Sequence, residues 1–219
     1  MKKTSNFLVI TGLLLFSCTE ADNKSTNAAA ELSKDTSTTA AVVATEAPMD
    51  SATIAKNWGA YMTPTDMHKM MASWNGKWNA AVSSWQSPES APEISKAINT
   101  NSMLLGGRYQ QGIHTGNMMG QPFEGRSMLA YDNAKKIFTT TWIDNMGTGL
   151  MILHGPWDEA TKSITFTGKS VDPAAGNGKE VDMKQMFKVV DDKNHLMEMY
   201  GKGPDGKEFK MMEIKYSRQ

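Results

Sequence analysis

The chain has a single cysteine and no net charge, and both features exclude classes of protein. One cysteine in 219 residues provides neither a disulfide framework nor a cysteine-based zinc site. The 23 Lys and Arg residues are balanced by 23 Asp and Glu residues. A protein that binds nucleic acid needs an excess of basic residues to displace counterions from the phosphates. The composition therefore argues against a nucleic-acid partner.

Catalytic and nucleotide-binding motifs are also missing. The chain has no Gly-x-Ser-x-Gly elbow and no His-Glu-x-x-His pair. Gly201, Gly206 and Lys207 have the spacing of a P-loop, but Glu208 stands where a P-loop has the hydroxyl that binds magnesium. Both flanks of this segment have the pattern of strands, so we interpret it as a hairpin turn. The sequence therefore favours a protein that is not an enzyme.

The N-terminus has the pattern of a secretory signal peptide. Lys2 and Lys3 precede an apolar run over residues 7–16, which is too short to span a bilayer as a permanent helix. The run is followed by Ser17 and then Cys18, an arrangement that resembles the bacterial lipobox. The resemblance implies cleavage before Cys18, lipidation of its thiol and a membrane anchor in the bacterial cell envelope, on the periplasmic face or the cell surface of the outer membrane. A secreted protein with an unmodified cysteine is the alternative.

Composition divides the chain into three parts. Residues 18–56 are rich in Ala, Ser, Thr and Asn and contain no aromatic residue, which is typical of a flexible tether. Aromatic residues, methionines and glycines recur from Trp58 to the end. We predict a signal peptide over residues 1–17, a lipidated cysteine and tether over 18–56, and one domain over 57–219. A domain of this size buries a core without disulfides.

The domain begins with the pattern of a short helix. Residues 63–66, Thr-Pro-Thr-Asp, offer an N-cap and a proline for the first turn. Apolar residues follow at helical spacing before Gly76: Met67, Met70, Met71 and Trp74. We predict a short amphipathic helix that acts as a plug.

Beyond Gly76 the pattern changes to a period of two, as in half-buried antiparallel strands. Turn signals such as Asp132-Asn133 and Asp144-Asn145 separate about ten predicted strands, near residues 77–86, 92–100, 103–115, 122–131, 136–144, 149–155, 163–171, 180–190, 195–202 and 207–217. Closing such a meander removes its exposed edges. The predicted fold is all-β, an antiparallel up-and-down β-barrel with a short N-terminal helix. We interpret Gly106-Gly107, and the phase change between Met211 and Met212, as bends or bulges within strands.

Several segments together resemble a known family. They are Gly76-Lys77-Trp78, Leu105-Gly106-Gly107-Arg108-Tyr109, Pro122-Phe123-Glu124-Gly125, Tyr131-Asp132-Asn133, Phe138 with Trp142-Ile143-Asp144-Asn145, and Met212-Glu213-Ile214-Lys215-Tyr216. Over about residues 60 to 218 the chain resembles the domain-of-unknown-function family 1579. The resemblance implies a barrel similar to the calycins, which include lipocalins, fatty-acid-binding proteins and haem-binding nitrobindins, and it assigns no activity. Trp78 and Arg218 also resemble the lipocalin pair in which an arginine lies across a tryptophan and closes one end of the barrel.

A closed sheet of about ten strands is wider than one of eight strands, so we expect space inside it. The candidates that face this space are Trp78, Phe138, Trp142, Phe166, Met183, Phe187 and Met197, with Arg108, Tyr131, Gln185 and His195 as polar anchors. Arg108 is either the partner of a ligand carboxylate or an ion-pair partner of an acidic residue on a neighbouring strand. A lining of methionines, which are adaptable in shape, suits an apolar guest.

We predict no metal site and no cofactor, although two alternatives remain open. A barrel brings distant histidines together, and His154 or His195 is a candidate axial ligand for haem. Methionine thioethers suit Cu(I), and Met197 and Met199 share a strand face. The simpler interpretation is that the histidines are hydrogen-bonded or exposed and that the methionines fill the core.

Three functions remain open. The first is a lipid-anchored binding protein for a small apolar or amphipathic molecule. The second is a packed barrel that serves as a structural or protein-interaction module of the cell envelope. The third is an enzyme or haem protein, which requires convergent polar groups with shifted pKa values. We predict the first, with the interaction module as the alternative; protein partners are unknown.

Overall fold

The computed structural model describes residues 48–203 and 205–219, so the predicted signal peptide, Cys18 and most of the tether lie outside the described residues. Residues Pro48–Gln219 form one unit. Among the described residues, no helix combines the length and the hydropathy that crossing a membrane requires.

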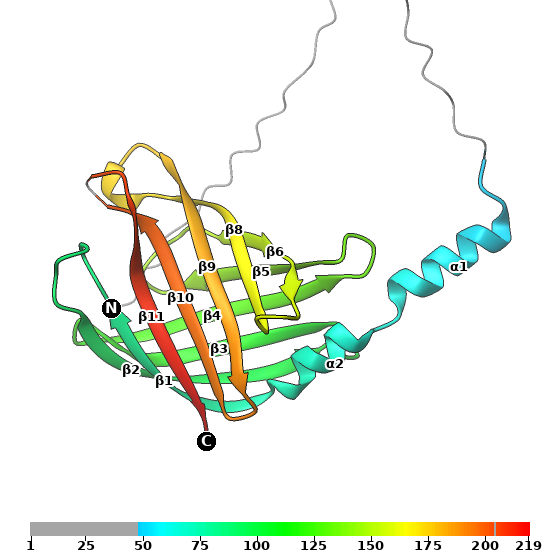
Figure 1. Cartoon of the computed structure of the whole chain (residues 1–219), viewed down its shortest axis with the longest axis horizontal. Helices are drawn as coiled ribbons and strands as arrows, with labels where there is room; N and C mark the ends of the chain where they lie inside the picture. Colours follow the sequence, from blue (N-terminus) through cyan, green and yellow to red (C-terminus); the bar gives the residue numbers. More distant parts are fainter. Residues whose placement is uncertain (1–47, 204) are drawn as a thin grey trace, which may run out of the picture. The chain divides into compact units, whose positions relative to one another are not determined.

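The strands form one antiparallel sheet that closes into a ten-strand barrel with an eleventh short strand beside it. Its members are β1 (Gly76–Ser84), β2 (Glu93–Leu104), β3 (Tyr109–Met118), β4 (Gln121–Asp132), β5 (Ile137–Asp144), β6 (Met151–Gly155), β7 (Trp157–Asp158), β8 (Ser163–Val171), β9 (Glu180–Asp191), β10 (Asn194–Lys202) and β11 (Glu208–Arg218) (Figure 1). With the exception of the closing pairs, neighbours in the sheet follow each other in sequence. The predicted up-and-down barrel is confirmed.

Two pairings close the barrel. Strand β1 pairs with β11, with Trp78 opposite Arg218, and β6 pairs with β8, with Leu153 opposite Gly168. The second closure needs a glycine, because a Cβ atom on Gly155 would lie only 2.1 Å from the carbonyl oxygen of Thr165. A side chain at this position would therefore prevent the close approach of the two backbones.

Aspartates shape the connections that were predicted from the sequence. The side chain of Asp132 accepts hydrogen bonds from the backbone N–H groups of Ala134 and Lys135, at 2.8 and 2.9 Å. Five more aspartate carboxylates accept a hydrogen bond from the backbone N–H two residues further along the chain: those of Asp144, Asp158, Asp172, Asp191 and Asp205. An aspartate carboxylate that satisfies the backbone in this way favours a tight turn. The segment that resembles part of a P-loop joins β10 to β11, which pair directly, so its interpretation as a hairpin is confirmed.

The two bends predicted within strands had different outcomes. Residues 105–108 form the turn between β2 and β3, so the prediction of a bend inside a strand at Gly106-Gly107 was wrong. Both glycines have positive φ, at 67° and 81°, which is the conformation of a tight turn. The bulge at Met211 is confirmed, because Met199 pairs with Met212 and the next residue, Tyr200, pairs with Lys210.

Two helices precede the barrel. Helix α2 (Asp66–Ser73) is the predicted plug, and its N-cap is Thr65, so Pro64 lies before the helix rather than in its first turn. Helix α1 (Ser51–Met62) was not predicted; it begins before the predicted domain boundary at residue 57. The Asp50 side chain accepts hydrogen bonds from the backbone N–H groups of Ala52 and Thr53, which is a regular N-cap.

The core lies where α2 meets the barrel. Met71 and Trp74 of α2 are buried together with residues of the strand layer beneath, namely Phe138, Leu153, Ile164 and Phe166. A second, smaller cluster joins Trp78 and Ala80 to Tyr216 across the closing pair of strands. Helix α2 therefore fills one end of the barrel.

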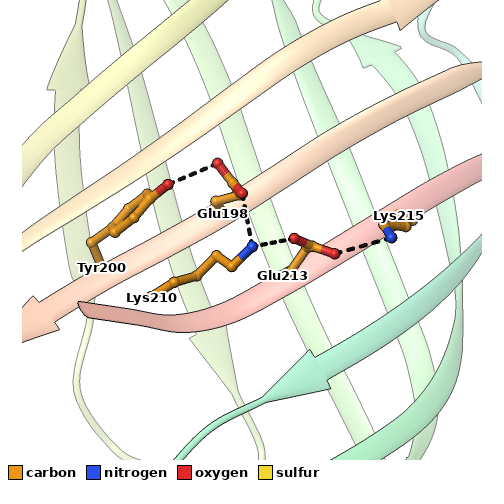
Figure 2. Close-up of polar contacts among 5 residues, drawn as sticks. All are labelled: Glu198, Tyr200, Lys210, Glu213 and Lys215. Carbon is orange, nitrogen blue, oxygen red and sulfur yellow. Dashed lines mark hydrogen bonds and ion pairs between the residues drawn. The ribbon is translucent and has the colours of Figure 1, made fainter. Parts of the chain in front are cut away.

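A charged network holds β10 and β11 together on the face that points away from the barrel interior (Figure 2). Glu198 and Glu213 are directly opposite each other, with side chains only 13% and 17% exposed, an arrangement that repels. The ammonium of Lys210 bridges both carboxylates, 3.1 Å from Glu198 Oε1. Tyr200 donates to Glu198 at 2.8 Å, and Lys215 lies 3.3 Å from Glu213. This network compensates the repulsion next to the bulge.

Candidate functional site: a cavity inside the barrel

The barrel encloses a cavity of about 410 Å³. Its wall includes residues from all ten strands of the closed barrel, and Trp74 of α2 contributes at the plugged end. At the other end, the wall includes Met118, Asp144 and Met146, which lie at the turns between strands. The volume is within the range of about 300–1,000 Å³ that is usual for small-molecule sites. The space expected inside the barrel is thus present.

One side of the wall is largely apolar and rich in methionine. It comes from the neighbouring strands β8–β11 and includes Phe166, Met183, Phe187, Met197, Met199, Met212 and Ile214. Met197 and Met199 share the inner face of β10, as the alternation predicted. Thioether side chains have several rotatable bonds, so such a surface adapts to apolar guests of different shapes.

The other side of the wall carries most of the polar side chains. It comes from the neighbouring strands β2–β5 and includes Asn99, Asn101, Gln110, His114, Ser127 and Thr140. Asn101 donates to the carbonyl oxygen of Trp74 at 3.2 Å, and Gln110 donates to Asn75 Oδ1 at 3.1 Å. These two amides hold the C-terminal end of α2 against the barrel.

Asn99 differs from these amides. Its side chain lines the cavity although the residue is only 6% exposed, and among the described residues its Oδ1 is the one buried side-chain polar atom without a hydrogen-bond partner. A buried acceptor without a partner costs about 1–3 kcal/mol. Asn99 is directly opposite His114 on the next strand, and the Nε2 atom of His114 lies 3.3 Å from Ser127 Oγ. The polar wall therefore offers unused hydrogen-bonding capacity to a guest.

Burial keeps both cavity histidines neutral. Desolvation lowers the pKa of His114 to about 4. The pKa of His195 is also lowered to about 4, first by desolvation and then by the positive charge of Arg218, against the opposing effect of Asp191 and Asp192. A histidine with so low a pKa is a weak general base, so the pair formed by His114 and Ser127 is better suited to hydrogen bonding than to activating a nucleophile.

The site residues predicted from the sequence fall into two groups, those that line the cavity and those that do not. Those that line the cavity are Trp78, Trp142, Phe166, Met183, Gln185, Phe187, His195 and Met197. Phe138 is fully buried in the core beneath α2 instead. Tyr131 and Arg108 line a separate hollow of about 220 Å³ beside α1. The Arg108 guanidinium donates to the carbonyl oxygens of Met62 and Leu105, so it is used to hold the connection between the helices.

Trp142 is positioned near the open end of the cavity by its neighbours. Its indole Nε1 donates to Asp144 Oδ2 at 2.7 Å, and its ring lies 6.3 Å from that of Phe123 in a stacked arrangement. Gly125 makes room for the indole, because a Cβ atom there would lie 2.4 Å from it. At the other end of the cavity, the ring of Phe187 lies 5.1 Å from that of Trp74.

Arg218 closes the plugged end, as the resemblance to the lipocalin pair implied. Its guanidinium lies 4.2 Å from the centre of the Trp78 ring and donates to the carbonyl oxygens of Ser73 and Asn75, at 2.7 Å each, and of Asp192, at 3.1 Å. One side chain thus joins α2, the β9–β10 turn and β1.

Replacing Arg218 with alanine is expected to lower the free energy of unfolding by about 2–3 kcal/mol, because the cation–π contact is lost and partly buried carbonyls lose their donors. Urea denaturation monitored by circular dichroism measures this. The matched control is Arg126→Ala, which removes an exposed arginine paired with Glu124 and should cost less than 1 kcal/mol. Equal losses in the two variants contradict a closing role for Arg218.

The sequence pattern did not predict the polar wall. Asn99 and Asn101 alternate with Ile98 and Thr100, and Ile94 on the same strand is 65% exposed. The usual rule, which places apolar positions inside, therefore predicts the wrong face for this strand. The signal that was available is the recurrence of amide and histidine side chains on one face, with Asn99 at the end of the strand predicted over 92–100, Asn101 just beyond it, and Gln110 and His114 on the next predicted strand.

The structure places the histidines in different surroundings. Within residues 48–203 and 205–219, no group of three or more His, Cys, Asp or Glu side chains is close enough to hold a metal ion. His154 is exposed and bonds to Thr139 Oγ1 at 2.9 Å, whereas His195 lies inside against the Trp78 ring, with ring centres 4.2 Å apart. His68 is at the start of α2, where its Nδ1 accepts a hydrogen bond from the backbone N–H of Thr65.

Comparison with known proteins identifies the family. A family model described as a protein of unknown function, DUF1579, matches residues 63–218, which include α2 and the whole barrel. The chain belongs to the DUF1579 family. The family resemblance inferred from the sequence segments is confirmed, and the cavity lies entirely within the matched region.

Other comparisons add little to this assignment. No curated protein matches the chain significantly. Among solved structures, a redesigned β-barrel aligns with 12% sequence identity and a TM-score of 0.34, covering 68% of this chain and 94% of that chain.

Proposed function

We propose that this DUF1579 protein binds a small apolar or amphipathic molecule inside its barrel and that Cys18 anchors it by lipid in the bacterial cell envelope. The observation that supports binding is the cavity of about 410 Å³ with a methionine-rich side and a polar side. A barrel that served only as a rigid module would gain stability by filling this volume with side chains, because empty space forfeits dispersion contacts. The anchor rests on the sequence around Cys18.

Native mass spectrometry of the full chain, purified from the membranes of its own host in a mild detergent, tests the proposal. The expected result is a discrete additional mass that leaves on unfolding, together with acyl chains on the N-terminal cysteine. An absorption spectrum of the same sample identifies a haem guest. A clean apo mass, with no guest acquired from a host lipid extract, contradicts the proposal.

Variants of the cavity wall should alter affinity for the bound guest. Trp142→Ala and Phe187→Ala each remove a large apolar contact, so we expect affinity to fall about tenfold or more, in line with the roughly 1.5–3 kcal/mol for burying such a side chain. Lys135→Ala and Lys193→Ala, in exposed turns, are the controls and should leave affinity unchanged. Fluorescence titration of variants with native circular dichroism spectra measures this. Equal, negligible effects of both sets count against the cavity as the binding site.

The alternative function is a protein-interaction module, and one feature favours it. Helix α1 carries an exposed apolar stripe with helical spacing, formed by Ile54, Trp58, Tyr61 and Met62, whose exposed fractions range from 41% to 59%. If the native protein carries no guest, this stripe is the first surface to test.

A further inference from the structure

The charges around the cavity restrict the guest that it accepts. The wall includes only two residues with formally charged side chains, Lys96 and Asp144, apart from the two histidines, which burial keeps neutral. Lys96 is an exposed residue on β2, between the inward positions of Ser95 and Ala97. The Asp144 carboxylate at the open end already accepts hydrogen bonds from Trp142 Nε1 and from the backbone N–H groups of Met146 and Gly147.

The arginines that a carboxylate guest would need are used elsewhere. Arg108, the candidate partner of an anionic head group, lines the other hollow and binds two backbone carbonyls. Arg218 lies over Trp78 and donates to three further carbonyls. Away from Lys96 and Asp144, a charged head group inside the barrel would therefore lose its hydration without gaining a partner of opposite charge, which is strongly unfavourable.

The polar wall also indicates which neutral group the guest carries. Asn99 Oδ1 is a buried acceptor without a partner, so a guest that donates a hydrogen bond to it would remove the cost of leaving it unsatisfied. Beside it, the positions of three polar atoms converge: a Cβ atom on Gly112 would lie 2.4 Å from Ser127 Oγ and 3.0 Å from both Asn101 Oδ1 and His114 Nε2. Oxygen atoms and a neutral imidazole accept hydrogen bonds from hydroxyl groups. The opposite wall of methionine and phenylalanine suits the apolar part of the same molecule.

We infer that the cavity binds an uncharged amphiphile, with a hydroxyl or similar donor group at Asn99 and an apolar chain against the methionine-rich wall. This inference rests on the proposed function, which it narrows from any apolar or amphipathic molecule to a neutral one that carries a hydrogen-bond donor. Fatty acids and alkylamines are excluded as preferred guests at neutral pH.

Four probes of similar length separate the contributions of charge and hydrogen bonding. They are decanol, methyl nonyl ether, decanoate and decylamine, titrated at pH 7 into the full-length protein with its tryptophan fluorescence as the signal. We expect decanol to bind about tenfold more tightly than the ether, which lacks the donor, and at least tenfold more tightly than either charged probe. Decanoate or decylamine binding as tightly as decanol overturns the inference and leaves the proposed function standing. Absence of binding by all four overturns both.

The variant Asn99→Leu tests the role of the orphaned oxygen. It should reduce the affinity for decanol about tenfold, leave the affinity for methyl nonyl ether unchanged, and leave the protein as stable as before or more stable, because the unsatisfied acceptor is removed. Asn79→Leu, on the exposed face of β1, is the control and should change neither affinity. If Asn99→Leu lowers the affinities for decanol and the ether equally, or changes neither, the inference that Asn99 accepts a hydrogen bond from the guest is overturned.

Discussion

Replacing Trp78 with alanine is expected to lower the free energy of unfolding by about 4 kcal/mol, the largest effect of any single substitution considered for this barrel. Trp78 is 1% exposed, and its indole Nε1 donates to the carbonyl oxygen of Trp74 at 3.0 Å. Arg218 covers one region of its ring and His195 lies against it, with centroid distances of 4.2 Å in both cases. The substitution therefore leaves a void, a Trp74 carbonyl that keeps only the Asn101 donor, and a guanidinium without its aromatic partner at the same point.

Chemical denaturation at pH 7 measures this loss. Trp58→Ala is the matched control, since Trp58 is 59% exposed on α1, and its loss should be within about 0.5 kcal/mol. If the alanine variant at position 78 does not fold, Trp78→Phe keeps most of the packing and should still lose about 1–2 kcal/mol through the missing N–H donor. A loss below 1 kcal/mol for Trp78→Ala would show that the closing strands do not depend on this residue.

Acidification from pH 6.5 to pH 5 is expected to destabilise the protein through its two cavity histidines. The unfolded chain takes up a proton on each ring near pH 6.5, whereas burial lowers the pKa of His114 and His195 in the folded protein to about 4. Between these values the unfolded state binds more protons, so stability falls as the pH falls. Each ring contributes up to about 1.4 kcal/mol per pH unit, which amounts to about 1.5 kcal/mol between pH 6.5 and pH 5 and to on the order of 3 kcal/mol by pH 4.

The double variant His114→Gln, His195→Gln isolates this contribution. Its free energy of unfolding should change much less between pH 6.5 and pH 5 than that of the wild type, although it is less stable at pH 7. Carboxylates with a lowered pKa, such as those of Asp191 and Glu159, act in the same direction but at lower pH, so the interval above pH 5 reports on histidine. An unaltered slope in the double variant contradicts the neutral, buried state of these rings.

The period of two along the chain was sufficient to predict ten strands and their order. Aspartate turns separate strands that pair with their neighbours, as the side-chain bonds of Asp132 and Asp144 show. The strand boundaries near Gly106-Gly107 were wrong because two glycines within an extended pattern suit either a bend or a turn, and only the pairing of β2 with β3 decides between them.

Helix α1 was missed for a different reason. Its surroundings in sequence are rich in Ala, Ser and Thr, and that composition suggested a tether. The local signals were present, however, since Asp50 is a good N-cap and Ile54, Trp58 and Met62 have a spacing of four residues. Asn133, on the β4–β5 turn, donates to the carbonyl oxygens of Ala60, Tyr61 and Thr63 near the end of this helix, a contact that no local pattern indicates.

The sequence by itself determined the fold class and the helical plug, because these depend on periodicity and on local patterns. The family and the pairing of Arg218 with Trp78 followed from resemblances to known proteins. Only the tertiary structure decided which side chains face the cavity. Alternation assigns residues to two faces but does not say which face is inside, and on β2 the polar face is the inner one. The closed sheet brings Asn99, His114 and Ser127 together from three strands and leaves Asn99 Oδ1 without a partner. It places Arg108 in a different hollow. These outcomes depend on strand register and closure rather than on any local pattern.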